Sequence, residues 1–178
     1  MKKLEECDPL ARFLAESADV SEDVMSSVAR CFCPDVRIGL ASNQRCPEEA
    51  LERMGSSYTW EVRALVAAHR NTDQATLRRL ATDPVIAVRV AAAANPNTPP
   101  SALEPLADDR SVKVRAALAG NKAAPLRTMQ RLATDRCACV RAALAANSGI
   151  TGGVLVTLQN DEDIEVSAIA NDPARRCA

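Results

Sequence analysis

Short apolar runs, each closed by a polar residue, recur along this chain with a period of 26 residues. The segment VRAALAGN at 114–121 returns as VRAALAAN at 140–147. Related segments in the same phase are VRIGLASN from 36, VRALVAAH from 62 and VRVAAAAN from 88. With Val36 as position 1, five complete repeats fill residues 36–165 without an insertion. A fixed period of this length predicts an architecture of stacked supersecondary units.

The first part of each repeat has the pattern of a helix. Position 22 is aspartate in four repeats, and Asp83 precedes a proline, which is typical of an N-cap followed by the first helical residue. The apolar pattern then continues as far as position 8, where Asn95 precedes Pro96 and predicts the helix end. His69 takes position 8 in one repeat, and we expect the same helix-end cap there.

A second and shorter helix is predicted in the rest of the repeat. It starts near Thr98 and Pro99 and carries leucine or methionine at positions 16 and 19, a spacing that places both on one helical face. Pro105 lies inside this helix in one repeat and predicts a strained or 3₁₀ turn there. The predicted core pairs are Leu51 and Met54, Leu77 and Leu80, Leu103 and Leu106, Met129 and Leu132, and Leu155 and Leu158.

The pattern V-R-x-x-L-A-x-N with a following proline, then L-x-x-L-A-x-D, resembles the leucine-rich repeat variant family, a bacterial relative in shape of the HEAT-type helical solenoids. The resemblance covers residues 10–173, and it implies a right-handed superhelix of alternating longer and shorter helices. The repeat here is slightly longer than the usual one of the family. Some members also hold a four-iron cluster in a cysteine-rich module, but this chain lacks the closely grouped cysteines, so we expect no cofactor.

These observations predict an all-α fold, a right-handed α-solenoid of about six two-helix repeats. We expect a degenerate capping repeat at 1–35, the five complete repeats at 36–165 and a half repeat at 166–178. Terminal repeats that differ from the central ones must face water, so we expect a monomer.

Charge and composition narrow the range of partners. The chain has 22 basic and 23 acidic residues, and this balance disfavours binding to nucleic acid or to an anionic membrane. Its apolar runs are shorter than a membrane span requires, and its first residues lack the pattern of a signal peptide. Seven scattered cysteines fit reduced thiols better than a disulfide framework, so we expect a cytoplasmic protein.

Two sets of arginines invite different interpretations. Arginine fills position 2 of every complete repeat, and together with the position-22 aspartates it predicts a structural ladder that ties the loops of neighbouring repeats. The ladder consists of Arg37, Arg63, Arg89, Arg115 and Arg141 with Asp83, Asp109, Asp135 and Asp161. Position 18 faces away from the core and carries a second set, which is either a solvated helix face or a groove for an acidic segment. This arginine stripe consists of Arg53, Arg79 and Arg131 with the nearby Arg78 and Arg127.

The N-terminal cysteines are the remaining candidates for chemistry. Cys7, Cys31, Cys33 and Cys46 could be considered as metal ligands, but a helix separates Cys33 from Cys46, and thiolates on one metal must lie about 4 Å apart. A redox-sensing alternative uses Cys31, Cys33, Cys46 and Cys137, which lie near predicted helix N-termini. The simpler interpretation is that these cysteines are small residues packed within a tight stack of helices.

We therefore expect a non-catalytic scaffold that binds an unidentified protein or peptide. If the arginine stripe is the binding site, that partner is acidic. One histidine gives no credible partner for a nucleophilic serine or cysteine, so we do not expect an enzyme. The alternatives are a metal-binding or redox-sensing protein that uses the N-terminal cysteines, and a HEAT-like DNA-binding protein. Neutral charge and few aromatic residues disfavour the last of these.

Overall fold

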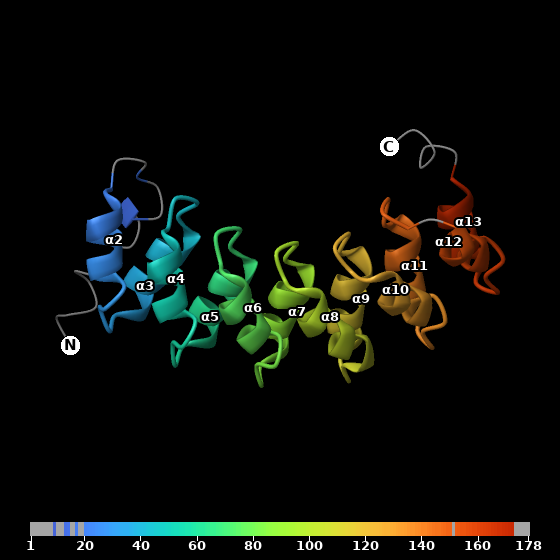
Figure 1. The fold of residues 1–178 in the computed structure, drawn as a ribbon, viewed down its shortest axis with the longest axis horizontal. Helices are drawn as coiled ribbons and strands as arrows, with labels where there is room; N and C mark the ends of the chain where they lie inside the picture. The colour runs from blue at the N-terminus through green and yellow to red at the C-terminus, as the bar shows by residue number, and fades with distance from the viewer. Residues whose placement is uncertain (1–8, 10–12, 15–16, 18–19, 151, 173–178) are drawn as a thin grey trace. The chain divides into compact units, whose positions relative to one another are not determined.

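The structure is a computed structural model that describes residues 9, 13, 14, 17, 20–150 and 152–172. Within these residues the regular elements are helices, and no strand is present (Figure 1). The chain forms two compact units, residues 1–97 and 98–178. Among the described residues, every helix is too short or too polar to span a lipid bilayer.

Unit 1 contains alternating longer and shorter helices. The longer helices pack against one another in sequence, α3 on α5 and α5 on α7, while the shorter α2 packs on α4. Their bounds are α2 Glu22–Val28, α3 Pro34–Ser42, α4 Glu48–Met54, α5 Trp60–Ala68, α6 Gln74–Leu80 and α7 Ile86–Ala94.

Unit 2 repeats the same arrangement. Here α9 packs on α11 and α11 on α13, while the 3₁₀ helix η1 packs on α10. The predicted effect of Pro105 is confirmed, because the helical segment changes from α to 3₁₀ at Glu104. The bounds are α8 Pro100–Leu103, η1 Glu104–Asp108, α9 Val112–Gly120, α10 Leu126–Leu132, α11 Ala138–Ala146, α12 Gly152–Gln159 and α13 Ile164–Asn171.

The longer helices begin two residues later than the sequence pattern predicts. Val85, not Asp83, is the N-cap of α7. The carboxylate of Asp83 instead accepts a hydrogen bond of 2.9 Å from the backbone N–H of Val85, and so closes the turn that leads into the helix. Asp109, Asp135 and Asp161 accept the same bond from the residue two positions on. The prediction that these aspartates are N-caps was therefore wrong.

Position 8 ends the longer helix of each complete repeat as predicted, and it also joins neighbouring repeats. Asn95 is the C-cap of α7, and its side-chain amide donates to the carbonyls of Ala67 and His69 in the preceding repeat, at 2.8 and 2.9 Å. Its side-chain oxygen accepts from the N–H of Asn97 at 2.9 Å. Asn43 and Asn147 donate in the same way to carbonyls of the preceding repeat.

His69 replaces asparagine and keeps one donor contact and one acceptor contact of this kind. Its Nδ1 accepts a bond of 3.1 Å from the N–H of Asn71, and its Nε2 lies 2.9 Å from the carbonyl oxygen of Asn43. Because Nδ1 is an acceptor here, Nε2 carries the proton and donates to that carbonyl. The imidazole thus reproduces the donor and the acceptor of an asparagine side chain.

The shorter helices bury the predicted residues at positions 16 and 19, with one exception. Leu155 is only half-buried, whereas its neighbour Val154, at position 15, is buried. Position 15 is filled by smaller residues in the other repeats, for example Ala50 and Thr76, so the larger Val154 takes core volume here. The helix α12 also starts at Gly152, whose φ of 56° lies in the left-handed region.

Leu103 tests the assignment of position 16 to the core. Its side chain is 0% exposed, so Leu103→Ala should leave a cavity and lower the free energy of unfolding by about 2–5 kcal/mol. The matched control is Leu126→Ala, because Leu126 is 59% exposed and should change it by less than about 0.5 kcal/mol. Chemical denaturation measures both. Equal effects of the two changes would contradict the assignment.

Candidate binding surface

The ladder arginines Arg63, Arg115 and Arg141 form two-pronged contacts with aspartates 20 residues later in the chain. Arg115 donates from Nε to Oδ2 of Asp135 at 2.6 Å and from Nη2 to Oδ1 at 3.1 Å. The two side chains are only 5% and 7% exposed. Arg63 with Asp83 and Arg141 with Asp161 have the same geometry. Such parallel, charge-assisted bonds fix the relative position of the two chain segments.

Each ladder arginine also contacts the loop that precedes its own helix. Nη1 of Arg115 donates to the carbonyl of Asp109 at 2.8 Å, six residues earlier. Nη1 of Arg89 likewise donates to the carbonyl of Asp83 at 2.8 Å. One guanidinium therefore links the loop before its helix to the loop of the following repeat. Arg37 differs because position 22 is Ser57 in its repeat, and Nη1 donates to that hydroxyl at 3.3 Å.

These contacts change the acidity of the aspartates. Burial alone would raise the pKa of Asp135, but hydrogen bonds from Arg115 and from the N–H of Cys137 outweigh it and lower the pKa below its ordinary value. The pKa of Asp161 is lowered mainly by its hydrogen bonds from Arg141. The carboxylates are therefore held in their charged form.

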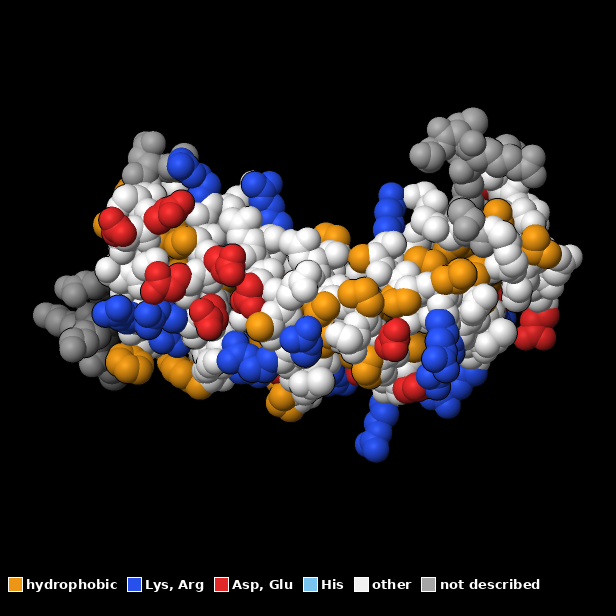
Figure 2. Space-filling view, viewed as in Figure 1, with side chains coloured by type: hydrophobic (Ala, Val, Ile, Leu, Met, Phe, Trp, Pro, Cys, Tyr) orange, Lys and Arg blue, Asp and Glu red, His pale blue; other side chains and the backbone are white. Residues whose placement is uncertain are grey.

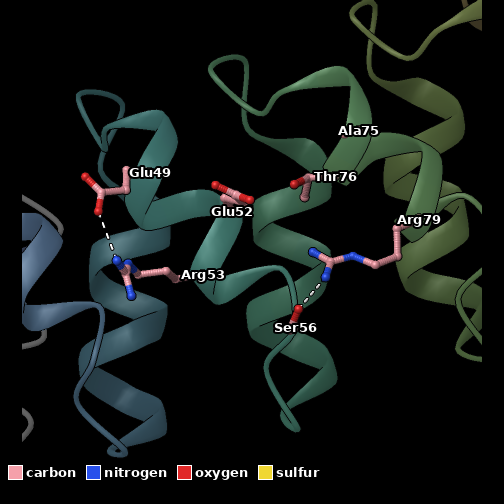
Figure 3. A pocket seen from close by; sticks show the side chains of 7 residues that line it. All are labelled: Glu49, Glu52, Arg53, Ser56, Ala75, Thr76 and Arg79. Carbon is pink, nitrogen blue, oxygen red and sulfur yellow. Dashed lines mark hydrogen bonds and ion pairs between the residues drawn. The ribbon is translucent and has the colours of Figure 1, made fainter.

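Two arginines of the stripe, Arg53 and Arg79, line a surface groove in unit 1 (Figure 3). Arg53 lies on α4 and pairs with Glu49, one turn earlier, at 3.0 Å. Arg79 lies on α6 and donates to the hydroxyl of Ser56, at the end of the neighbouring shorter helix. The groove has a volume of about 620 Å³, and its walls are Glu49, Glu52, Arg53, Ser56, Ala75, Thr76 and Arg79.

A glycine allows Arg79 to lie across the end of α4. A Cβ atom added at Gly55 would lie 2.8 Å from Nη2 of Arg79 and 2.8 Å from Cγ2 of Thr76. Any side chain at this position would therefore force Arg79 and Thr76 to shift from these positions.

Unit 2 has a smaller groove of the same kind. Arg131 on α10 pairs with Asp108 at the end of η1, and both side chains are more than half exposed. Arg127 lines the same groove, which has a volume of about 310 Å³. Arg78 in unit 1 is exposed but does not line the groove beside Arg79. The structure thus places four of the five stripe arginines in grooves, Arg53 and Arg79 in one and Arg127 and Arg131 in the other.

Sequence reasoning missed an exposed aromatic edge in unit 1. Phe32, Tyr58 and Trp60 are 81%, 70% and 43% exposed, and the hydroxyl of Tyr58 donates to the carbonyl of Phe32 at 3.1 Å. The ring of Phe32 also lies 6.0 Å from the guanidinium carbon of Arg37. Figure 2 shows hydrophobic side chains along this lower edge of the unit. The available signal was that Phe32 and Tyr58 both occupy position 23 of the repeat.

The N-terminal cysteines that the structure describes, Cys31, Cys33 and Cys46, do not form a cluster that could hold a metal ion. Cys31 and Cys33 are partly exposed before and at the start of α3, whereas Cys46 is buried, and burial raises the pKa of its thiol to about 12. Cys7 lies outside the described residues. Within the part of the chain that the structure describes, no three histidine, cysteine or acidic side chains are grouped closely enough to hold a metal ion.

Two-helix repeats that bond to their neighbours at both ends of the longer helix define a helical-repeat protein, an α-solenoid. Residues 60–85 and 86–111 match the sequence profile of the family described as leucine rich repeat variant. The resemblance of this chain to the leucine-rich repeat variant family is thereby confirmed.

A solved structure agrees with this result. It is described as a leucine-rich repeat variant with a novel repetitive protein structural motif, and it is similar with a TM-score of 0.62 over 94% of this chain and 78% of that one. The sequence identity is 22%, so the likeness supports the fold. Comparison with curated proteins finds no match.

Arg115 tests the ladder as a source of stability. Arg115→Ala would leave Asp135 buried without its main partner, and this should lower the free energy of unfolding by about 3–5 kcal/mol. Arg110→Ala removes an exposed arginine from the same unit and should cost less than about 0.5 kcal/mol. Urea denaturation of both variants measures the difference. Unchanged stability of Arg115→Ala would show that the pair contributes nothing to the fold.

The lowered aspartate pKa values predict a specific sensitivity to acid. A carboxyl whose pKa is lower in the folded than in the unfolded protein contributes stability above its ordinary value of 3.8, and the contribution disappears as the pH falls through the folded pKa. Asp135→Asn should therefore be less stable than the parent at pH 7 and lose less stability between pH 4 and pH 2. Thermal unfolding across this range, with exposed Asp108→Asn as control, measures the slope. Parallel curves for the parent and Asp135→Asn would refute the prediction.

Proposed function

We propose that this chain is a non-catalytic scaffold whose shorter helices bind an extended, acidic segment of another protein. The observation that supports the proposal is the groove in which Arg53 and Arg79 extend from successive repeats. Repeats place similar side chains at regular intervals, and an extended segment that crosses the helices meets them in turn.

The charges in the groove favour a carboxylate-bearing segment at Arg79. This guanidinium donates to the neutral hydroxyl of Ser56, so that contact does not cancel its charge. The Arg53–Glu49 pair is 44% and 62% exposed, and exposed pairs of this kind contribute little to stability. A carboxylate of a bound segment can therefore replace these contacts with bidentate ones at low cost.

The aromatic edge supports protein binding independently of charge. All four aromatic residues of the chain are exposed, although its aliphatic residues fill the core. Exposed tyrosine, tryptophan and phenylalanine are enriched at protein interfaces because they bury a large area with few rotatable bonds. The four residues are Phe13, Phe32, Tyr58 and Trp60.

The proposal includes the other properties expected from the sequence, namely a monomer in the cytoplasm without a catalytic site. The expectation of no catalytic site rests on the sequence, in which one histidine leaves no credible partner for a nucleophilic serine or cysteine.

The stripe can be tested with peptides of defined charge. We expect fluorescein-labelled acidic peptides to bind the full chain, and matched basic peptides not to bind. The double change Arg79→Glu and Arg131→Glu should weaken acidic-peptide binding by about tenfold or more, because each charge-assisted bond contributes roughly 1.5–3 kcal/mol. Added salt should slow association with the parent protein. Fluorescence anisotropy and stopped-flow mixing measure both effects.

The matched control is Arg70→Glu with Arg110→Glu, which makes the same charge change on two exposed residues outside both grooves. This control should reduce affinity far less than the change of Arg79 and Arg131. Equal losses would show that peptides respond to net charge alone, and binding that survives the change of Arg79 and Arg131 would exclude the stripe.

A further inference from the structure

Two cysteines on the exposed side of unit 2 have their sulfur atoms in contact. Cys137 is the N-cap of α11, and Cys139 is the second residue of that helix. Their Sγ atoms lie 2.8 Å apart. Cys139 is exposed and Cys137 partly exposed, so small molecules in solution can reach the pair. This contact is distinct from the grooves and the aromatic edge.

The two thiols differ in reactivity. The contact with the Cys139 sulfur lowers the pKa of Cys137, and hydrogen bonds from the backbone N–H groups of Cys139 and Val140 lower it further. The same sulfur contact raises the pKa of Cys139, and burial adds to the rise. Two charged residues of the ladder also affect these pKa values. Asp135 raises the pKa of both thiols, and Arg115 lowers that of Cys139. This difference, together with the position of Cys137 at the N-terminus of α11, favours Cys137 as the nucleophile and Cys139 as the thiol that follows it.

We propose that Cys137 and Cys139 form a dithiol site that exchanges with low-molecular-weight disulfides. In the first step the Cys137 thiolate attacks one sulfur of the small disulfide, which forms a mixed disulfide and releases one small thiolate. In the second step Cys139 loses its proton to the released thiolate and attacks Sγ of Cys137. The Cys137–Cys139 bond forms, and the second small thiolate leaves and takes a proton from water. Two protein thiols are oxidised, and one small disulfide is reduced to two thiols.

The local geometry suits ring closure. A disulfide requires the two sulfur atoms to approach to about 2.05 Å. From the observed 2.8 Å this is a small movement of two side chains at the helix start. The N–H of Cys137 is held by Oδ1 of Asp135 at 2.9 Å, so the ladder fixes the backbone on one side of the pair.

A second Cys-x-Cys sequence in the chain provides an internal comparison. Cys31 and Cys33 have the same spacing, but there the backbone N–H of Cys33 donates to the sulfur of Cys31 at 3.4 Å. Cys46 is buried, with the pKa of its thiol raised to about 12, and should not react in the folded protein.

The test is reaction of the reduced full-length chain with glutathione disulfide, followed by alkylation of the remaining thiols, trypsin digestion and mass spectrometry. Cleavage after Arg136 and Arg141 gives a peptide of residues 137–141 that contains both cysteines. In the parent protein we expect this peptide to lose two hydrogen atoms and to resist alkylation. In Cys139→Ser it should retain glutathione on Cys137, because the second step is absent. In Cys137→Ser, Cys139 should react several-fold more slowly than Cys137 does in Cys139→Ser, because burial still raises the pKa of Cys139 while the backbone N–H groups still lower that of Cys137.

The control variant carries Cys31→Ser and Cys33→Ser and should form the 137–139 disulfide at the parent rate. Circular dichroism of each variant confirms that the helices are retained. Full alkylation of both cysteines after treatment of the parent would overturn the proposal. The proposal would also fail if Cys139→Ser accumulated no mixed disulfide, or if Cys137→Ser reacted as fast as Cys139→Ser.

Discussion

The side-chain amide at position 8 is the contact on which the stacking of these repeats depends. A helix leaves its last carbonyl groups without partners, and burial of such groups is costly unless a donor reaches them. In unit 1 the amide of Asn95 reaches back to two carbonyls of the preceding repeat, and His69 reaches back to a carbonyl of the repeat before it. The end of each of these helices is thus completed by the repeat that follows, which makes neighbouring repeats parts of one structure.

The guanidinium ladder performs the corresponding task at the other end of the longer helices. Because Arg115 binds both its own loop and Asp135, the loops at the helix starts are held at a fixed separation. With both ends tied and the apolar faces packed, the shorter helices and the outer loop edge are left to vary. The grooves and the aromatic edge are formed by exposed side chains of the shorter helices and of these loops, so the surface can change without loss of the fold.

The repeat period alone predicts the helices, their order and nearly all buried leucines, because burial and periodicity are properties of spacing. The individual hydrogen bonds and ion pairs are harder to predict from the sequence. An aspartate that precedes a proline can be the N-cap of a helix or part of the turn that leads into the helix. Only the structure shows which of these roles Asp83 has. Asparagine at a helix end gives the same signal whether it only caps its own helix or also donates to the preceding repeat. The stripe was placed on one face by spacing, but the partners of Arg53 and Arg79 come from other turns and repeats. Cys139 lay inside a predicted helix, where nothing in the sequence indicates contact with Cys137.

Since each repeat offers the same acceptors on one side and the same donors on the other, a block of 26 residues is a self-compatible unit of growth. Duplication of one block inserts a repeat whose amide finds the carbonyls behind it and whose own carbonyls meet the next amide. Deletion of one block rejoins matching surfaces. Such a chain can lengthen or shorten during evolution by whole repeats. Each event changes the distance between surface side chains on the two sides of the junction by the length of one repeat.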